Sequence, residues 1–395
     1  MNQGDPRRDV GAGGWGRLRR MRPWHLLASA TIAAAFAAGG AVAAPPPVTA
    51  RAYILVNPAT QEVLAARRPD VRLPMASTTK LMTALVTLER AKLGDIVVVP
   101  KAATAAGGSS SGLVPGERLP VRTLLKGLMV ASGNDASVAL AFHVGRGSEA
   151  RFVAMMNREA KQLGLANTHY ANPHGLDHPR HYSTVRDMVT LGEQAMEFPV
   201  IRNVVRRRVA FIPGPGGRGT RRLESENDLL AIDRDADGVK TGHTDGAGYA
   251  LVAHATRASN GTELYAAMIG SPSRAQRARD AKRLLDWGFA QYVRVVPLRA
   301  GRVVVRVPVR DRPGVTVPLT VDRTLTVSIH SGRTLRRALV VPAEIVGPLA
   351  AGTVVGEVAI KDGGRVLGTR KLVLAEAVNG PSIAERIRSG LGRLV

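Results

Sequence analysis

The spacing of apolar residues changes along the chain, and each change predicts a different kind of element. From Ala52, the segment AYILVNPATQEVLAARR alternates between apolar and polar positions. This alternation predicts two short strands joined by a polar turn at residues 57–61. Between residues 77 and 196, apolar residues recur three and four positions apart, which predicts a layer of helices.

Strand patterns return after this helical block. Residues 209–212, a Gly/Pro turn and a basic run to Arg222 predict an exposed hairpin. GYALVAHATR and TELYAAMIGS predict two buried strands, and AQRARDAKRLLDWGFAQY predicts a closing helix. Strands before and after a helical block imply an α/β sandwich-like domain over residues 45–292.

The pattern changes again beyond Val295. Short β-rich runs separated by Gly, Pro and Asp predict a small antiparallel sandwich or barrel over residues 293–380. Residues 381–395 place apolar side chains on one helical face and arginines elsewhere. This tail fits a basic amphipathic helix on an anionic membrane, and equally a segment packed on its own domain or frayed.

The first 44 residues predict an export signal. A basic segment precedes the uncharged residues 26–44, which end with a small-residue cleavage pattern at Ala41-Val42-Ala43. The long, Ala-rich apolar stretch leaves an uncleaved single-span anchor as the alternative. Either way, the folded part is expected outside the cytoplasm, in the cell wall or at the outer face of the cytoplasmic membrane. The chain has no Cys, which excludes disulfides, a thiol nucleophile and a thiolate metal site.

Charge narrows the range of partners. The formal net charge is +24, and +20 remains without the first 44 residues. An exported protein with this charge meets anionic wall polymers and lipid head groups first. Aromatic residues make up only 4% of the chain, too few for the stacking platforms that bind single-stranded nucleic acid. Nucleic acid is therefore not an expected partner.

Three short motifs occur in a fixed order. Ser77-Thr78-Thr79-Lys80 begins a helix, and residues i and i+3 share a helical face, so the Lys80 ammonium can reach the Ser77 hydroxyl. Ser132-Gly133-Asn134 lies in a polar break between helical runs, and Lys240-Thr241-Gly242 precedes the GYALVAHA strand. Each motif alone is weak. Together they predict a serine nucleophile that is activated by lysine without a histidine.

The three motifs resemble those of the low-molecular-weight penicillin-binding proteins that are serine-type D-alanyl-D-alanine carboxypeptidases. The resemblance extends to SGNDASVALA, GLANTHYANPHGLDHPRHYSTVRDM and GVKTGHTDGAGYALVA. It implies an α+β fold: a β-lactamase/transpeptidase-like domain with an antiparallel sheet and helices on both sides, followed by a small all-β C-terminal domain. It also implies peptidoglycan pentapeptides ending in D-Ala-D-Ala as substrates and β-lactams as covalent inhibitors.

The resemblance assigns roles to residues of this chain. The catalytic residues would be Ser77 as nucleophile, Lys80 as base and Ser132 as proton relay to the leaving amine. Burial and the charge of Lys240 would lower the pKa of Lys80. The substrate-binding residues would be Asn134, Lys240, Thr241, Gly242, His243 and Arg277.

Each substrate-binding residue has an expected task. The Asn134 amide would bind the peptide groups of the substrate, and the backbone N–H groups of Ser77 and His243 would hold the oxyanion. Lys240 and Thr241 would bind the terminal carboxylate, and Gly242 would leave space for an extended substrate along the strand edge. Arg277 is a second candidate for the carboxylate, chosen among three neighbouring arginines.

Two patterns in the sequence suggest metal sites, but each lacks a ligand that such a site needs. Residues 233–238 imitate the start of an EF-hand loop, but its twelfth position is Thr244 rather than a bidentate Glu. His174 and His243 lack a third ligand at metal spacing. No metal and no cofactor is therefore expected.

Two rival functions remain open. A serine β-lactamase would share the three motifs, but residues 172–188 offer no clear Glu for deacylation, and such enzymes lack a β-rich second domain. A non-catalytic wall-binding scaffold would use the positive charge alone. The favoured hypothesis is an exported D-Ala-D-Ala carboxypeptidase that trims stem pentapeptides through an acyl-enzyme.

Overall fold

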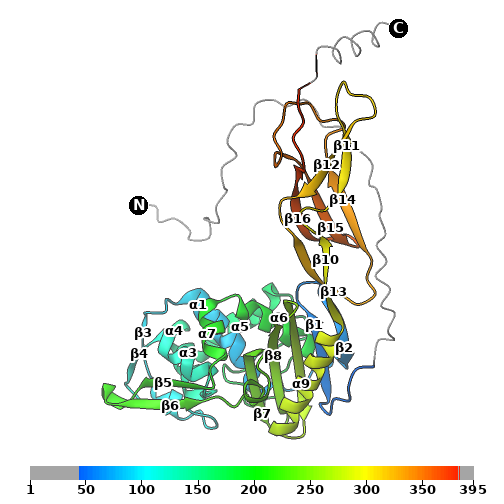
Figure 1. Cartoon of the computed structure of the whole chain (residues 1–395). Helices are drawn as coiled ribbons and strands as arrows, with labels where there is room; N and C mark the ends of the chain where they lie inside the picture. The colour runs from blue at the N-terminus through cyan, green and yellow to red at the C-terminus, as the bar shows by residue number, and fades with distance from the viewer. Residues whose placement is uncertain (1–43, 381, 383–395) are drawn as a thin grey trace, which may run out of the picture. The chain divides into compact units, whose positions relative to one another are not determined.

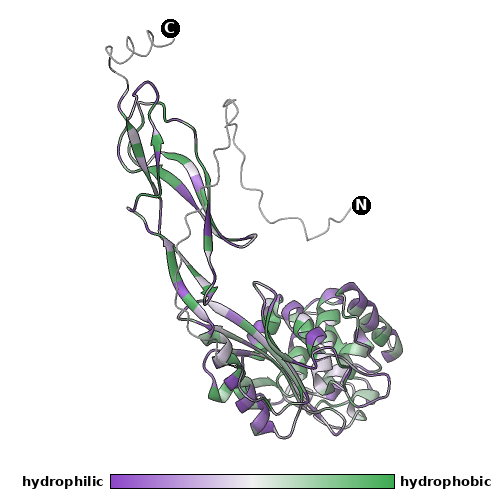
Figure 2. Ribbon diagram, turned by 90° about the vertical axis from the view of Figure 1, so that its right-hand side faces the viewer, coloured by the Kyte–Doolittle hydropathy of each residue, from purple (hydrophilic) through white to green (hydrophobic). Residues whose placement is uncertain are grey.

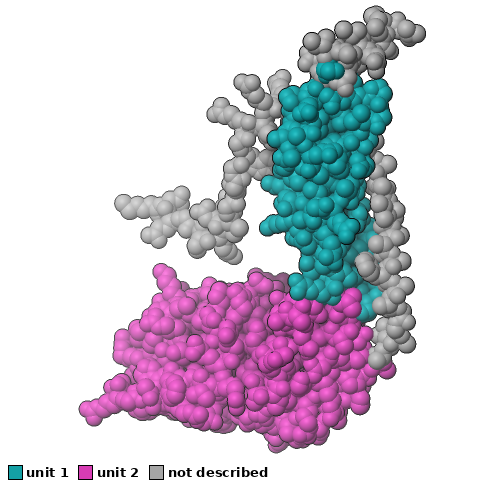
Figure 3. Space-filling model, viewed as in Figure 1, with its two compact units in different colours: residues 1–38, 294–395 teal, residues 39–293 magenta. Residues whose placement is uncertain are grey.

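The computed structural model describes residues 44–380 and Ser382. Except for Ala44 and Ser382, the predicted signal or anchor and the predicted tail lie outside the described residues. The described chain forms two compact units, which divide between Val293 and Arg294 (Figure 3). No helix in residues 44–380 has both the length and the apolar character needed to cross a bilayer.

An antiparallel five-stranded sheet forms the frame of the unit that ends at Val293, unit 2 in Figure 3 (Figure 1). Its strand order is β2-β1-β9-β8-β7, so that β7 is an edge strand. The predicted turn joins β1 to β2, and the two predicted buried strands are β8 and β9. The strands are β1 (Ala52–Asn57), β2 (Glu62–Arg67), β7 (Ala236–Thr244), β8 (Gly248–Arg257) and β9 (Thr262–Ser271).

Alternation along the central strands gives the sheet two apolar faces. On β8, Leu251 and Ala253 belong to a core with Leu284 and Leu285 of α9 (Arg274–Ala290). Their neighbour Val252 instead joins a larger core with α6 (Val185–Met196). Side chains that alternate across a strand explain how one strand serves both cores. The predicted antiparallel sheet with helices on both sides is confirmed.

The larger core continues into a helical layer that carries two of the three motifs. The 3₁₀ turn η1 (Ala76–Thr79) leads directly into α1 (Lys80–Arg90), and Ser132 lies between α3 (Val121–Met129) and α4 (Asn134–Val144). Two small two-stranded antiparallel sheets belong to the same unit. The remaining elements are α2 (Lys101–Thr104), α5 (Glu149–Gln162), α7 (Pro199–Val205), α8 (Leu229–Ile232), β3 (Ile96–Val98), β4 (Arg118–Pro120), β5 (Val209–Pro213), η2 (Pro215–Gly217) and β6 (Thr220–Glu224).

The unit that begins at Arg294, unit 1 in Figure 3, is a β domain with its own core. One sheet has the order β11-β12-β16-β15-β14, and β13 pairs with β10. Hydrophobic and hydrophilic residues mix along these strands (Figure 2), and the buried ones include Leu319, Val358 and Leu372. The predicted all-β C-terminal domain is confirmed. The strands are β10 (Tyr292–Leu298), β11 (Val305–Pro308), β12 (Thr316–Val321), β13 (Leu325–His330), β14 (Leu335–Val340), β15 (Val354–Asp362) and β16 (Arg365–Leu374).

A buried histidine on β8 faces two carboxylates from the neighbouring strands. His254 Nδ1 lies 2.5 Å from Oδ1 of Asp237, and its Nε2 lies 3.9 Å from Oε2 of Glu263. Burial lowers the pKa of His254, but the interactions with Asp237 and Glu263 outweigh burial and raise that pKa to about 9. The charged imidazolium therefore stabilises the folded sheet.

His254 is expected to make stability depend on pH. A pKa that is raised by folding adds stability that is complete below the ordinary value of 6.5 and is lost as pH rises through about 9. His254→Gln should lower the free energy of unfolding by about 1–2 kcal/mol at pH 6, since both carboxylates are largely exposed, and by much less at pH 10. Urea unfolding at both pH values measures this difference. An equal loss at both would assign the effect to packing on Tyr265, whose ring centroid is 4.5 Å away.

Candidate active site

Ser77 and Lys80 meet at the junction of η1 and α1. Ala76 has a φ of +50°, an uncommon value for a residue with a side chain, and it starts the tight turn that carries Ser77. Lys80 Nζ lies 2.8 Å from Ser77 Oγ. Strained backbone beside a candidate nucleophile is typical of functional sites. The turn thus brings an amine to a partly buried hydroxyl.

The other neighbours of Lys80 define what its amine can do. Nζ lies 2.7 Å from Asn134 Oδ1 and 2.7 Å from the carbonyl oxygen of His174, and both of these atoms can only accept hydrogen bonds. A neutral amine has two N–H donors and one lone pair. If both N–H groups bond the carbonyl oxygens, the lone pair remains for the Ser77 hydroxyl proton.

Electrostatics favours that neutral form. Lys80 is completely buried. Burial and, secondly, the positive charge of Lys240 bring the pKa of Lys80 well below its ordinary value of 10.5. Both effects penalise the ammonium more than the amine. Lys80 can therefore serve as a base at a lower pH than an exposed lysine could.

A second hydroxyl–amine pair lies between the helical layer and the edge strand. Ser132 follows α3 with a φ of +58° and is 2% exposed. Lys240 Nζ lies 2.9 Å from Ser132 Oγ and 2.9 Å from the Thr241 carbonyl oxygen. Burial, reinforced by the nearby Arg277 charge, lowers the pKa of Lys240 to about 7, although the charge of Glu226 opposes this shift. This pair can carry a proton to or from a reacting group.

Gly242 lets the edge strand approach the nucleophile closely. A Cβ on Gly242 would meet the backbone nitrogen of Ser77 at 2.8 Å and Ala76 Cβ at 2.9 Å. The sequence suggested that Gly242 leaves space for substrate. The structure adds another reason for glycine, because β7 and η1 touch at this point.

Gly242→Ala is therefore expected to lower activity by about 100-fold, since the new methyl group must move Ser77 relative to β7. The measurement is kcat/KM for a peptide ending in D-Ala-D-Ala, the substrate that the family resemblance implies, alongside thermal unfolding to show that the variant is folded. Gly94→Ala is the matched control, since a Cβ at Gly94 would meet only Arg122 Nη1, at 4.0 Å. Similar activities for both variants would show that the close approach is not needed.

The Asn134 side chain has protein partners for both of its polar atoms. Oδ1 contacts Lys80 Nζ, and Nδ2 donates to the Gly107 carbonyl oxygen at 2.7 Å. The sequence suggested that this amide binds the peptide groups of a substrate. In the structure, Asn134 joins α4, Lys80 and the loop before β4, so that it also positions the amine.

Arg277 and His243 occupy different environments. Arg277 is 2% exposed and donates to the carbonyl oxygens of Glu226 at 2.8 Å and Gly242 at 3.4 Å. Arg277 thus fixes the edge strand β7 through the Gly242 carbonyl oxygen. Of the three candidate arginines, it is the one that contacts the Lys240-Thr241-Gly242 segment. His243 is exposed at the end of β7, where its ring stacks on Tyr249 with centroids 4.1 Å apart.

Three contributors escaped the sequence reasoning. The His174 carbonyl holds Lys80, and no side-chain pattern can identify a backbone acceptor. Asp135 accepts from the backbone N–H of Ser111 and Leu113, which fixes the loop before β4. The third is the segment Glu226-Asn227. The Glu226 carbonyl oxygen accepts from Arg277, and the Asn227 side chain donates to the Gly238 carbonyl oxygen of β7. Only the acidic character of Asp135, directly after Asn134, could have drawn attention to it.

The site has no metal character within the described chain. Among residues 44–380, no group of three or more His, Asp or Glu side chains is placed to hold a metal ion. Burial, helped by the Lys80 charge, lowers the pKa of His174 to about 4, so that its ring is neutral at pH 7. The arrangement supports acyl transfer by a hydroxyl nucleophile, an amine base and a second hydroxyl–amine pair.

Comparison with known proteins agrees with this chemistry. A family model described as D-alanyl-D-alanine carboxypeptidase matches residues 40–273, and one described as the C-terminal domain of penicillin-binding protein 5 matches residues 292–380. The chain is 33% identical over 380 residues to D-alanyl-D-alanine carboxypeptidase DacA of Escherichia coli (strain K12), covering 91% of this chain and 92% of that protein. It is 35% identical over 346 residues to DacC of the same strain, covering 84% of each.

Two solved structures are also similar to this chain. Penicillin binding protein 5 from Haemophilus influenzae superposes with a TM-score of 0.61 at 31% identity, covering 85% of this chain and 99% of the other. The Streptomyces K15 DD-transpeptidase superposes with a TM-score of 0.59 at 34% identity, covering 63% and 100%. The second similarity is confined to a smaller share of this chain.

Proposed function

Because the chain belongs to the D-alanyl-D-alanine carboxypeptidase family, we propose that Ser77 is its nucleophile, Lys80 its base and Ser132 its proton relay. The predicted family and transpeptidase-like fold are confirmed, and so is the predicted enzyme class, a serine hydrolase. The enzyme removes the terminal D-alanine of peptidoglycan stem pentapeptides, and its family binds β-lactams. The roles of individual residues are our assignment.

One observation carries the assignment of the nucleophile. Lys80 Nζ lies 2.8 Å from Ser77 Oγ, and its two other neighbours are carbonyl oxygens. A buried amine with a lowered pKa can take the Ser77 proton as Oγ attacks the carbonyl carbon between the two D-alanines. The C–N bond then breaks, and the proton reaches the leaving amine through Ser132. Water hydrolyses the resulting ester.

The edge strand supplies the proposed substrate contacts. A peptide added alongside β7 would bring its terminal carboxylate to Lys240 and Thr241. The oxyanion would bind the backbone N–H groups of Ser77 and His243. Arg277 would help from behind the strand by fixing the Gly242 carbonyl, and Asn134 would bind substrate only by releasing one of its present partners.

We also propose a location and a division of the chain. The family consists of extracytoplasmic cell-wall enzymes, and the basic amphipathic pattern of residues 381–395 would hold this one at the outer face of the cytoplasmic membrane. Residues 45–292 would form the catalytic domain and 293–380 the β domain. Sedimentation with anionic vesicles, with and without the last fifteen residues, tests the membrane contact. Equal binding of both chains would refute it.

The proposed function is tested by two measurements on the exported domain. After incubation with benzylpenicillin, mass spectrometry should find a stable penicilloyl adduct on the peptide that contains Ser77. The same protein should release D-alanine from diacetyl-Lys-D-Ala-D-Ala. Rapid penicillin turnover without peptide cleavage would indicate a β-lactamase. If neither an adduct nor cleavage were found, only the hypothesis of a non-catalytic wall-binding scaffold would remain.

A further inference from the structure

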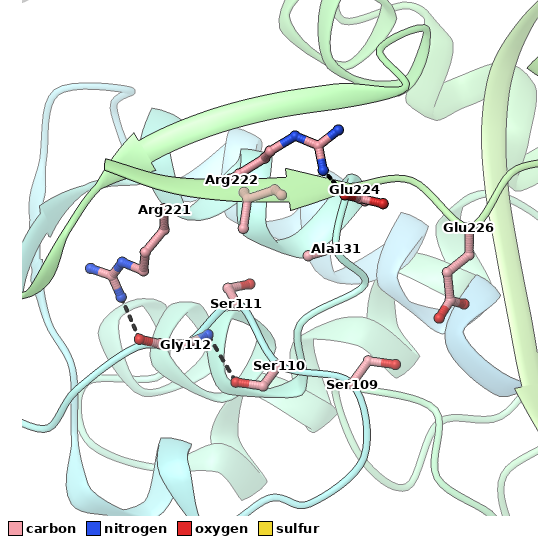
Figure 4. A pocket seen from close by; sticks show the side chains of 10 residues that line it. Ser109, Ser110, Ser111, Gly112, Ala131, Arg221, Arg222, Glu224 and Glu226 are labelled. Carbon is pink, nitrogen blue, oxygen red and sulfur yellow. Dashed lines mark hydrogen bonds and ion pairs between the residues drawn. The ribbon is translucent and has the colours of Figure 1, made fainter. Parts of the chain in front are cut away.

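Two loops border the proposed active site, and each is tied to a neighbouring strand by a charged side chain. The loop before β4 lines a polar cavity together with β6 (Figure 4). There Arg221 donates to the Gly112 carbonyl oxygen and pairs with Glu117. The second loop, residues 172–177, is tied to the end of β7 by Asp177. This second connection joins two parts of the proposed catalytic machinery.

The loop at residues 172–177 lies directly against the segment that carries the proposed nucleophile. Its His174 carbonyl oxygen accepts a hydrogen bond from Lys80 Nζ at 2.7 Å. Gly175 has a φ of +98°, and a Cβ at this position would collide with the carbonyl oxygen of Ala76 in η1. Backbone therefore packs on backbone here, and a movement of the loop would move the carbonyl oxygen that orients the Lys80 amine.

Asp177 binds the end of the edge strand with both of its carboxylate oxygens. Oδ1 accepts from the Thr244 hydroxyl at 2.7 Å, and Oδ2 accepts from the Gly246 backbone N–H at 2.9 Å. Thr244 is the last residue of β7 and directly follows His243, whose backbone N–H is a proposed oxyanion donor. Two hydrogen bonds to one charged carboxylate fix the loop relative to this strand end.

These contacts form a closed ring. The strand β7 touches η1 at Gly242, where a Cβ would meet the Ser77 backbone nitrogen at 2.8 Å. The loop at residues 172–177 lies against η1, and Asp177 returns from this loop to β7. The proposed base and the proposed oxyanion donor belong to different segments of the ring, so their separation depends on its closure. A misplacement of about 1 Å in such an arrangement can cost about 100-fold in rate.

We propose that Asp177 is a positioning residue, which fixes the Lys80 amine and the His243 N–H relative to each other by holding the loop against the end of β7. The inference rests on the proposed function and deepens it. Asp177 acts through the His174 carbonyl at one end and through Thr244 at the other. Because an oxyanion forms in acylation and again in deacylation, both steps depend on this connection.

Each of the two segments that Asp177 joins has a support of its own. Within the loop, Asn172 Oδ1 accepts from the Gly175 N–H at 2.7 Å. In the turn after β7, Arg51 donates to the Gly246 carbonyl oxygen at 2.6 Å. Asp177 itself is exposed. Its removal is therefore expected to loosen the connection between the two segments without unfolding either of them.

Asp177→Ala is expected to lower kcat for D-alanine release from diacetyl-Lys-D-Ala-D-Ala by about 10- to 100-fold. The single-turnover rate of acylation by benzylpenicillin and the rate of release of the penicilloyl group should fall by similar factors. KM for the peptide should then change little, because both steps slow alike. Thermal unfolding checks that the variant is folded.

Asp245→Ala is the matched control for Asp177→Ala. Asp245 is an exposed carboxylate in the same turn, and within residues 44–380 it has neither a hydrogen bond nor an ion pair. This variant should keep the wild-type rates of both steps.

Variants of Thr244 show whether Asp177 acts through the strand end. Thr244→Ser keeps the hydroxyl and should stay within about threefold of the wild-type kcat. Thr244→Val keeps the shape without the hydroxyl and should lower kcat by about tenfold, as for a lost hydrogen bond to a charged group. In the Asp177→Ala background the same change should have an effect of about twofold or less, because the bond is already lost.

The charge of Asp177 also acts on His181, whose Nε2 lies 2.7 Å from Thr79 Oγ1 in η1. Burial lowers the pKa of His181 to about 3, so its ring is neutral at pH 7 with or without the Asp177 carboxylate. Rates measured at pH 7 therefore report the hydrogen bonds of Asp177 rather than the protonation of His181.

The outcomes separate this inference from the proposed function. A kcat of Asp177→Ala within about twofold of the wild type would overturn the inference and leave the proposed function intact. So would a raised KM with unchanged acylation and deacylation, or effects of Asp177→Ala and Thr244→Val that multiply in the double variant. If Asp177→Ala did not fold, equal kcat values for Thr244→Val and Thr244→Ser would overturn the inference. A wild type that neither cleaved the peptide nor formed the adduct would overturn both.

Discussion

Ser77→Ala is expected to lower kcat for D-alanine release by about 10⁴-fold or more and to abolish the penicilloyl adduct. Removal of a nucleophile has effects of this size in serine hydrolases. The hydroxyl lies 2.8 Å from the Lys80 amine, and no change of backbone is needed to accept alanine in the 3₁₀ turn. Release of D-alanine is measured with diacetyl-Lys-D-Ala-D-Ala, and the adduct by intact mass.

Thermal unfolding shows whether Ser77→Ala remains folded, and Ser110→Ala provides a matched control at a second serine near the site. The Ser110 hydroxyl donates a hydrogen bond to Asp135 and does not contact Lys80. The Ser110→Ala variant should therefore lose far less activity than Ser77→Ala. If Ser77→Ala still released D-alanine at a rate near that of the wild type, the nucleophile would be another group. A wall-binding scaffold would keep its biological role in this variant, and a carboxypeptidase would not.

The three motifs of the proposed site could be singled out from the sequence because their geometry is local or their order is informative. Three residues along a helical turn place Lys80 beside Ser77 whatever the rest of the chain does. The strands β8 and β9 were also visible, because their apolar runs are bounded by clear turns. The β-rich C-terminal domain followed from the change in pattern beyond Val295, whereas the α+β fold of the first domain was implied by the family resemblance.

Contacts made across the fold could not be identified in this way. The two carbonyl oxygens beside Lys80 come from segments 54 and 94 residues away, and one of them is backbone. The bonds of Arg277 to backbone carbonyls depend on how α9 packs against β8 and β9. Composition and spacing carry no information about such long-range partners.

Lys80→Met is expected to slow acylation of Ser77 by about 10³- to 10⁴-fold, because it removes the only amine that contacts the Ser77 hydroxyl within the described residues. Methionine has nearly the same length and no charge, so it fits a site that is completely buried. The measurement is the rate of benzylpenicillin acylation under single-turnover conditions. Thermal unfolding accompanies it, since the Asn134 and His174 carbonyls lose a donor.

Lys80→Arg tests whether Lys80 acts as a base or only as a fixed positive charge. Arginine keeps the charge and can donate to the same carbonyl oxygens, but it does not lose a proton in proteins. If Lys80 is the base, Lys80→Arg should be about as slow as Lys80→Met. The wild-type acylation rate should also rise with pH at values well below 10.5, the ordinary pKa of lysine, because burial and Lys240 stabilise the neutral amine. An active Lys80→Arg enzyme with the wild-type pH profile would mean that Lys80 only neutralises charge, and that a different group takes the serine proton.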